Sequence, residues 1–283
     1  MRLHPVRTYL LQTFGWSWLV LLTLYTAHRL GWLSYASLQL GYNLGAAGPA
    51  LGAVLAARRH YGAAGLRALG RRLGPMPWSG VVRGLVLAPL VLLGAGLLSY
   101  PLATGQVFRF AVTQAQFHLG TPLSYLLWAL PLLSYAVLEE IGWRGFLLPH
   151  LQQHHSALTS TVLLTGIWGC WHAPMFLYRL QFSPWMTVGF FLSLLVGALL
   201  LTAVFNASGG SVLACAAFHL ANNAASAFDQ EYVVVVVGAG YVLLAAGLLG
   251  RYGPAALAPG ARIGNYLRHP AAVLASAASR VRR

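Results

Sequence analysis

Two adjacent carboxylates, Glu139 and Glu140, lie inside an apolar stretch of a chain that has four acidic residues in all. The stretch, Pro122 to Leu148, is long enough to cross a lipid bilayer as a helix. A charged side chain at membrane depth costs at least about 2.5 kcal/mol on insertion scales, so such residues are rare and usually functional. The other two acids, Asp229 and Glu231, fall between apolar segments. The glutamate pair therefore constrains the fold and the function more than any other feature.

The composition is that of a membrane protein. Of the 283 residues, 58% are hydrophobic and 8% are charged, whereas a soluble domain carries roughly 25% charged residues. The net charge of +14 would suit a nucleic-acid-binding protein, but the arginines cluster between and after apolar spans. The sequence predicts an all-α, polytopic membrane helical bundle whose partner is the lipid bilayer and which binds no nucleic acid.

Eight apolar segments reach the length of about 20 residues that a membrane-spanning helix needs. The second contains two glycine pairs, Gly41/Gly45 and Gly48/Gly52, at a spacing that lets helices approach closely. The predicted spans are 9–28, 37–57, 84–104, 122–148, 159–178, 184–205, 210–228 and 232–250.

The arginines predict the orientation of the bundle. With eight spans and a cytoplasmic N-terminus, fourteen of the eighteen arginines fall in cytoplasmic segments, three fall outside, and Arg144 lies within a span. This is a strong positive-inside bias. We therefore expect both termini in the cytoplasm of a multi-pass protein of a bacterial plasma membrane.

The expected organisation has four parts and no internal repeat. Residues 1–121 hold the first three spans and a basic cytoplasmic loop, and residues 122–228 form a catalytic core of four spans. Residues 229–250 form the last span. Residues 251–283 form a basic cytoplasmic tail, for which contact with anionic lipid and disorder are equally good interpretations.

The two glutamates are predicted to point in different directions. Glu140 and Arg144 are four residues apart, so they share a helix face and can form an ion pair. Glu139 is turned away from Arg144 by roughly 140°, at about 100° per residue. The charge of Glu140 is thus neutralised by an ion pair, while Glu139 remains available for chemistry.

Two later spans carry further polar side chains. Trp168 and His172 share one helix face, and His219 and Asn223 share another. At about 1.5 Å per residue, Glu139, His172 and His219 lie at similar depths, roughly 14–20 Å from the cytoplasmic ends of their spans. We expect them to meet in one water-accessible cavity that opens toward the cytoplasm. Taken alone, each histidine would equally suit a hydrogen-bonded core residue.

These motifs together resemble the CPBP intramembrane proteases, which include the CAAX prenyl proteases of the Rce1 type and the bacterial Abi proteins. EExxxR stands on one helix, an aromatic-xxx-His on the next and HxxxN two helices later, with WRGFLLP following the acids. The resemblance covers residues Leu123 to Phe228. One departure is Trp168, where the family more often has Phe.

The resemblance implies an intramembrane endopeptidase that hydrolyses a peptide bond of a membrane-associated protein or peptide tail. Glu139 would be the catalytic base and would activate a water with His172. His219 and Asn223 would stabilise the tetrahedral oxyanion. The residues in structural support would be Glu140, Arg144 and Trp168.

Two mechanisms stay open at this point. Glu139, His172 and His219 would form a catalytic zinc set with an open fourth position. A metal-free glutamate mechanism is slightly favoured, because an Asn223 amide aimed at the oxyanion would be redundant if zinc already polarised the carbonyl.

Other functions fit the residues less well. A non-catalytic peptide-binding or bacteriocin-immunity protein of the same fold would have no need for four intact site residues. A haem carrier with His172 and His219 as axial ligands would leave the glutamates unexplained. A proton-coupled transporter would more often show inverted repeats or broken helices.

Overall fold

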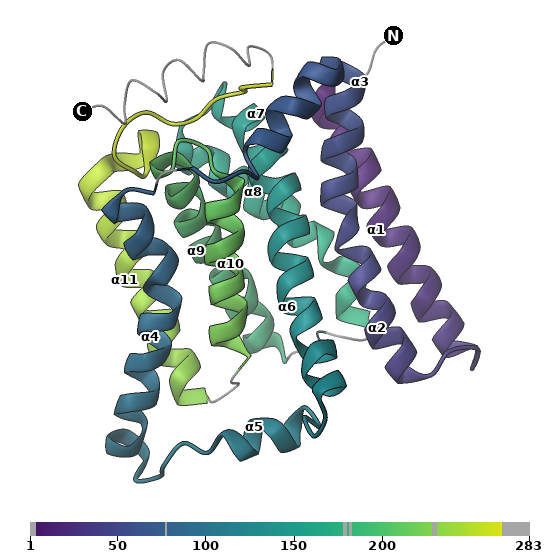
Figure 1. Ribbon diagram of the computed structural model, residues 1–283, viewed down its shortest axis with the longest axis vertical. Helices are drawn as coiled ribbons and strands as arrows, with labels where there is room; N and C mark the ends of the chain where they lie inside the picture. The colour runs from purple at the N-terminus through teal and green to yellow at the C-terminus, as the bar shows by residue number, and fades with distance from the viewer. Residues whose placement is uncertain (1–3, 77, 178–179, 181–182, 228–230, 268–283) are drawn as a thin grey trace.

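The computed structural model describes residues 4–76, 78–177, 180, 183–227 and 231–267 (Figure 1). Within these ranges the chain is all-α and contains no strand. A π-helical turn, Trp143–Leu147, joins α6 to α7, and a 3₁₀ turn, Ala173–Leu177, follows α8. The α-helices are α1 (Pro5–Arg29), α2 (Tyr35–Gly45), α3 (Ala47–Arg71), α4 (Gly80–Thr104), α5 (Phe110–Gln116), α6 (Pro122–Gly142), α7 (Leu148–Gln152), α8 (Ala157–Trp171), α9 (Pro184–Ala207), α10 (Val212–Ser226) and α11 (Glu231–Ala256).

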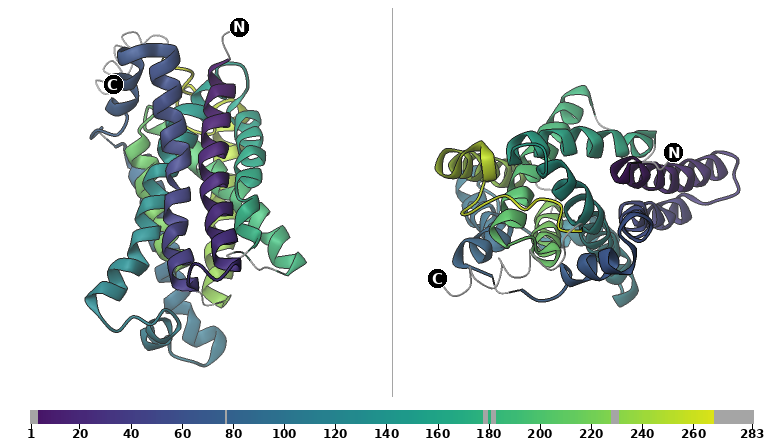
Figure 2. Two further views of the ribbon diagram at one scale, coloured as in Figure 1. Left: turned by 90° about the vertical axis from the view of Figure 1, so that its right-hand side faces the viewer. Right: turned by 90° about the horizontal axis from the view of Figure 1, so that it is seen from above.

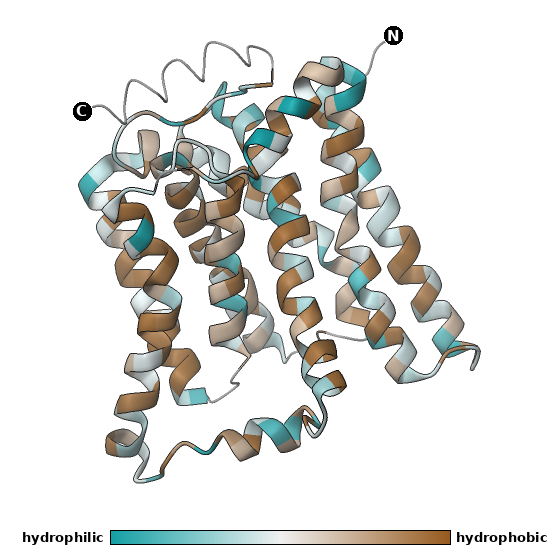
Figure 3. Ribbon diagram, viewed as in Figure 1, coloured by the Kyte–Doolittle hydropathy of each residue, from teal (hydrophilic) through white to brown (hydrophobic). Residues whose placement is uncertain are grey.

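This is a multi-pass membrane protein. Six helical stretches in the described chain are long and apolar enough to cross a bilayer: α1, α2–α3, α4, α6–α7, α9 and α11. Hydrophobic residues predominate along these helices, whereas hydrophilic segments gather near their ends (Figure 3). Each of the eight predicted spans contains a helix, but α8 and α10 have 15 residues each. At about 1.5 Å per residue they are shorter than the hydrocarbon core of about 30 Å, so eight spans and two cytoplasmic termini remain predictions.

Short sequence signals set the beginnings of these helices. Serine or threonine caps most of them, with a side-chain oxygen that accepts a hydrogen bond from a backbone N–H of the first turn. At α6, Thr121 and Ser124 form a reciprocal capping box, and Pro122 occupies the first turn, where no N–H is needed. The serine caps are Ser34, Ser79, Ser156, Ser183 and Ser211.

Two helices continue past the predicted ends of their spans, in each case beyond a bend. The basic loop expected after residue 57 is a continuation of α3 to Arg71, with a bend at Gly62. The last helix runs to Ala256, past the expected end at residue 250, with a bend at Gly253. Both glycines have positive φ, 63° and 70°, which glycine adopts without steric cost. Arginine is a good helix former, so these helices persist where the apolar pattern stops. Asp229 and residues 268–283 of the predicted tail lie outside the described residues.

The helices surround α10. It packs against α4, α6 and α9, while α8 and α11 pack against α9. On one side of this core, α1 packs against α2 and α3, and α3 packs against α6 (Figure 2). On the other side, α4 and α11 lie side by side. The helices of the predicted catalytic core therefore occupy the middle of the bundle.

The two ends of the bundle differ in charge. Helix α1 begins, α3 ends, α4 begins and α11 ends at the same end (Figure 1). We call it the arginine-rich end, because most of the described arginines belong to these helix ends and their connections: Arg7, Arg58, Arg59, Arg67, Arg71, Arg72, Arg83, Arg251 and Arg262. At the opposite end, α5 crosses from α4 toward α6.

The glycine pairs of the second span lie at a close helix contact, as predicted, and the structure shows that the partner is α1. A Cβ atom added to any of them would overlap a side chain of α1, and at two positions it would also approach the α1 backbone. The pairs are Gly41 with Leu24, Gly45 with Leu21, Gly48 with Ser17 and Thr13, and Gly52 with Thr13 and Tyr9. The absence of side chains at these positions is what lets the helices approach.

Replacing Gly48 by alanine should destabilise the protein. The new Cβ would lie 2.7 Å from the carbonyl oxygen of Thr13 and would overlap the Ser17 hydroxyl. Overpacking of this kind costs about 1–3 kcal/mol. Gly15→Ala on α1 is the matched control, because nothing lies within 4 Å of its added Cβ. Thermal unfolding in detergent should show a lower midpoint for Gly48→Ala only. Equal midpoints for the two variants would mean that the stability of the protein does not depend on the close approach of α1 and α3.

Candidate active site

The two glutamates stand near the end of α6, immediately before the π-helical turn. Glu139 is 2% exposed and Glu140 is fully buried. A π-helical turn inserts one extra residue into a helix and is frequent at functional sites. Every residue of the turn is buried, including Trp143 and Arg144, so both glutamates are surrounded by packed side chains.

Glu140 binds two basic groups through one oxygen. Its Oε1 accepts a hydrogen bond from Arg144 Nη1 at 2.9 Å and another from His219 Nδ1 at 2.8 Å. The predicted ion pair between Glu140 and Arg144 is therefore present. The bond to His219 comes from α10, 79 residues further along the chain, and was not predicted. Glu140 thus ties α10 to α6 as well as neutralising the arginine.

Glu139 is held by two tryptophans. Its Oε2 accepts hydrogen bonds from Trp143 Nε1 at 3.1 Å and from Trp168 Nε1 at 2.6 Å. The ring of Trp168 also lies 4.8 Å from the guanidinium carbon of Arg144, a distance at which a cation is attracted to the ring face. Trp168, predicted as an aromatic wall, is therefore also a hydrogen-bond donor. Phe at this position would lack that bond.

His172 is oriented by the backbone of its own helix. Its Nδ1 lies 2.7 Å from the carbonyl oxygen of Trp168. A carbonyl oxygen only accepts, so Nδ1 carries the proton and the neutral ring has its acceptor at Nε2. The ring lies edge-on to Trp171 and Phe190, with centroid distances of 5.0 and 5.2 Å. The predicted pairing with Trp168 on one helix face is present, at 5.9 Å between centroids.

Asn223 lies one turn beyond His219 on α10. Its Nδ2 donates a hydrogen bond to the carbonyl oxygen of Leu132 on α6 at 3.0 Å. An amide nitrogen carries two N–H groups, so this bond leaves one for another partner. Sequence spacing placed His219 and Asn223 on one face, but the structure directs their bonds to different parts of α6.

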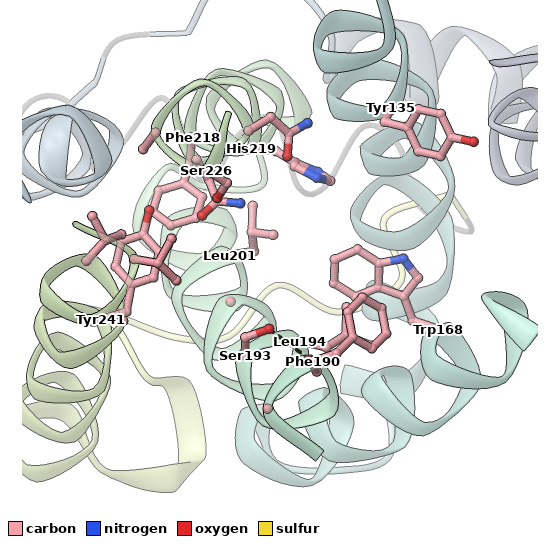
Figure 4. Close-up of a pocket in the computed structure, with 18 of the residues that line it drawn as sticks. Tyr135, Trp168, Phe190, Ser193, Leu194, Leu201, Phe218, His219, Ser226 and Tyr241 are labelled. Atoms are coloured by element: carbon pink, nitrogen blue, oxygen red, sulfur yellow. Dashed lines mark hydrogen bonds between the residues drawn. The ribbon is translucent and has the colours of Figure 1, made fainter. Parts of the chain in front are cut away.

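One cavity of about 650 Å³ brings the predicted site residues together (Figure 4). This volume falls within the range of ordinary ligand-binding pockets. The catalytic candidates Glu139, His172, His219 and Asn223 all line it, as does Trp168. Glu140 and Arg144 are not among its lining residues. The cavity is enclosed by α6, α8, α9, α10 and α11, and its remaining walls are largely apolar.

The exposed lining residues of the cavity are spread along its helices. Met186, Ser226 and Val234 lie near helix ends that are away from the arginine-rich end (Figure 1), whereas Gly189, Ser193 and Gly238 lie further along α9 and α11. That the cavity opens toward the cytoplasm stays a prediction. The depth argument could not choose a side, because a group about 15 Å into a core of about 30 Å is equally far from both surfaces.

The zinc set of Glu139, His172 and His219 stays a prediction. Within the described chain, no three His, Cys, Asp or Glu side chains are placed to hold one metal ion. Glu139 Oε2 faces two indole N–H groups, and the Nδ1 atoms of both histidines are hydrogen bonded. Glu139 Oε1 and the Nε2 atoms of the two histidines are therefore the atoms that could bind a water molecule or a metal ion.

Comparison with known proteins identifies the core of the chain. Residues 121–225 match the family described as Type II CAAX prenyl endopeptidase Rce1-like. The matched segment runs from the start of α6 into α10 and includes every predicted site residue. The chain is also 28% identical over 181 residues to a protein of Methanococcus maripaludis named CAAX prenyl protease 2. That alignment covers 58% of this chain and 63% of the relative, so the chain spans somewhat under two thirds of the length of the protein it matches.

The buried charge network generates a prediction about stability. Glu140→Gln would leave the fully buried Arg144 without its carboxylate, and breaking such a pair costs about 3–5 kcal/mol. The double variant Glu140→Gln/Arg144→Met also removes the unpaired guanidinium, so it should unfold at a higher temperature than Glu140→Gln alone. Thermal unfolding in detergent measures both. A double variant less stable than Glu140→Gln would contradict this account.

Proposed function

We propose that this protein is an intramembrane endopeptidase that cleaves a membrane-associated protein or peptide. The proposal depends mainly on Glu139: a buried carboxylate fixed by two indole N–H groups, facing a cavity that two imidazoles also line. The Rce1-like family and the similarity to a CAAX prenyl protease support the same activity.

Glu139 is the proposed general base. Both indole donors bind Oε2, which leaves Oε1 to take a proton from a water molecule in the cavity. His172 presents its Nε2 acceptor as the second partner of that water. A water that is held by two acceptors is oriented for attack on a peptide carbonyl carbon, and general base catalysis contributes about 10²–10⁴-fold.

His219 and Asn223 are the proposed oxyanion donors. The Nδ1–H of His219 is used by Glu140, so His219 would donate to the oxyanion from Nε2 and must then carry both protons. Glu140 is the counter-charge for that doubly protonated ring. Asn223 would supply its second amide N–H. Donors held in place before the reaction stabilise the developing negative charge without reorganisation.

Peptide termini in membranes test the activity and identify the substrate together. Cells that make the wild type should contain new termini that fall by at least about 100-fold in Glu139→Gln, because the amide cannot act as a base. The glutamine keeps the size of the side chain and an oxygen for the two indoles. Glu231→Gln, at the exposed start of α11, is the control and should match the wild type.

Identical termini for the wild type and Glu139→Gln, with both proteins folded and abundant, would exclude catalysis by this carboxylate. The cavity would then be a binding site, and the peptide-binding or immunity alternative would take its place.

The two tryptophan donors generate a second test. Trp168→Phe keeps an aromatic ring but removes the 2.6 Å bond to Glu139. Hydrogen bonds to charged groups contribute about 1.5–3 kcal/mol, so cleavage should slow roughly 10-fold or more through kcat, with KM little changed. Trp171→Phe is the matched control, because the buried Trp171 Nε1 has no hydrogen-bond partner in the described structure. Equal loss in both variants would show that ring packing, and not the indole N–H, matters.

A further inference from the structure

The chain that follows α11 is not helical, yet much of it is buried. It crosses the arginine-rich end of the bundle as residues 257–267 (Figure 1), which we call the strap. Ile263, Tyr266 and Leu267 of the strap are 6%, 1% and 2% exposed. The strap lies outside residues 121–225, the segment that matches the Rce1-like family, and none of these described residues lines the cavity. Its hydrogen bonds nevertheless lead to the proposed active site.

The strap supplies a donor that the π-helical turn lacks. Gly145 lies four residues before Pro149, and proline has no N–H, so the carbonyl oxygen of Gly145 cannot form the ordinary α-helical hydrogen bond. The Tyr266 hydroxyl donates to that oxygen. A buried carbonyl group needs such a donor, and the donor comes from a residue 121 positions further along the chain.

A second series of hydrogen bonds joins the strap to the next carbonyl group of the turn. The Nδ1–H of His150 donates to the carbonyl oxygen of Phe146 at 2.6 Å, which leaves Nε2 of the neutral ring to accept the Tyr61 hydroxyl at 2.8 Å. Asn265 of the strap donates to the same hydroxyl at 3.1 Å. Strap residues therefore hold two neighbouring carbonyl groups of the turn, one directly and one through two side chains.

The π-helical turn supplies one partner to each glutamate. Trp143 and Arg144 are its first two residues, and they donate to Glu139 and Glu140 respectively. A shift of the turn would move the Trp143 indole and rotate the Glu139 carboxylate that it holds. Misplacement of a reacting group by about 1 Å can cost about 100-fold in rate.

We infer that Tyr266 is a positioning residue for the proposed endopeptidase. Its hydroxyl holds the π-helical turn in the geometry that directs Glu139 toward the cavity. The effect of Tyr266 on cleavage rests on the proposed function, whereas its effect on the turn does not.

Amide hydrogen exchange tests the effect on the turn. Tyr266→Phe removes only the hydroxyl, because the ring keeps its contact with the Arg72 guanidinium at 4.4 Å. In the full-length protein in detergent, exchange across residues 143–150 should become about 10-fold faster. Tyr232→Phe is the matched control, because it removes a hydroxyl that donates to Ser99 of α4 at 3.1 Å, and the turn should then exchange as in the wild type. Wild-type exchange of the turn in Tyr266→Phe would overturn the inference.

Peptide termini test the effect on cleavage. At equal amounts of folded protein, the Glu139-dependent termini should form at least about 10-fold more slowly in Tyr266→Phe and at the wild-type rate in Tyr232→Phe. With the peptide so identified as substrate, kcat should fall while KM stays unchanged, which a mere loss of folded protein would not produce. Undiminished cleavage by Tyr266→Phe, or equal loss in both variants, would reject the positioning role. If the wild type forms no Glu139-dependent termini, the proposed function fails while the exchange result still stands.

A second variant tests the other connection of the strap. Asn265→Ala breaks the bond to Tyr61 and leaves Tyr266 in place, so it remains informative if Tyr266→Phe does not fold. It should speed exchange of the turn and slow cleavage, both by a smaller factor than Tyr266→Phe. Wild-type exchange and cleavage in Asn265→Ala would show that the strap does not hold the turn through Tyr61.

Discussion

The burial of two adjacent carboxylates inside an apolar bundle is the constraint that organises this structure. Neither charge is stable there without partners, because an unpaired ion in a low-dielectric interior costs several kcal/mol. Glu140 Oε1 is paired with Arg144 and His219, although Glu140 Oε2 is buried without a hydrogen-bond partner in the described structure. Glu139 Oε2 accepts from the indoles of Trp143 and Trp168. These bonds join α6 to α8 and α10, so satisfying the charges also fixes the relative positions of three helices.

The two carboxylates are held by different kinds of partner. Glu140 is bound to basic groups and does not line the cavity, which suits a structural counter-charge. Glu139 is bound to neutral N–H groups through one oxygen and lines the cavity. Trp168 links the two, because its N–H binds Glu139 while its ring lies against Arg144. This difference in partners is the physical basis for assigning catalysis to Glu139 in our proposal.

At the arginine-rich end, buried side chains hold the end of α11 and the chain that follows it against the bundle. Asn206 on α9 donates to the carbonyl oxygen of Ala256, and Gln152 on α7 donates to the carbonyl oxygen of Ile263. Because buried carbonyl groups need hydrogen-bond donors, these two amides let a non-helical segment pack in the interior.

The sequence by itself determined the class of protein, the glutamate pair and the contacts within single helices. The ion pair of Glu140 with Arg144 and the pairing of Trp168 with His172 follow from residues four apart. Such neighbours are fixed by the 3.6-residue period of the helix whatever surrounds it. The apolar pattern likewise predicted every long helix, although not where α3 and α11 stop.

Only the tertiary structure decided the contacts between helices. The bond from His219 to Glu140, the indole bond from Trp168 to Glu139 and the position of the cavity depend on the rotation and tilt of each helix. These are set by the packing of many side chains together, which no spacing within one helix records. From the sequence, an indole is treated as an apolar ring. Its single N–H forms a hydrogen bond only where the fold brings an acceptor, such as Glu139, against it.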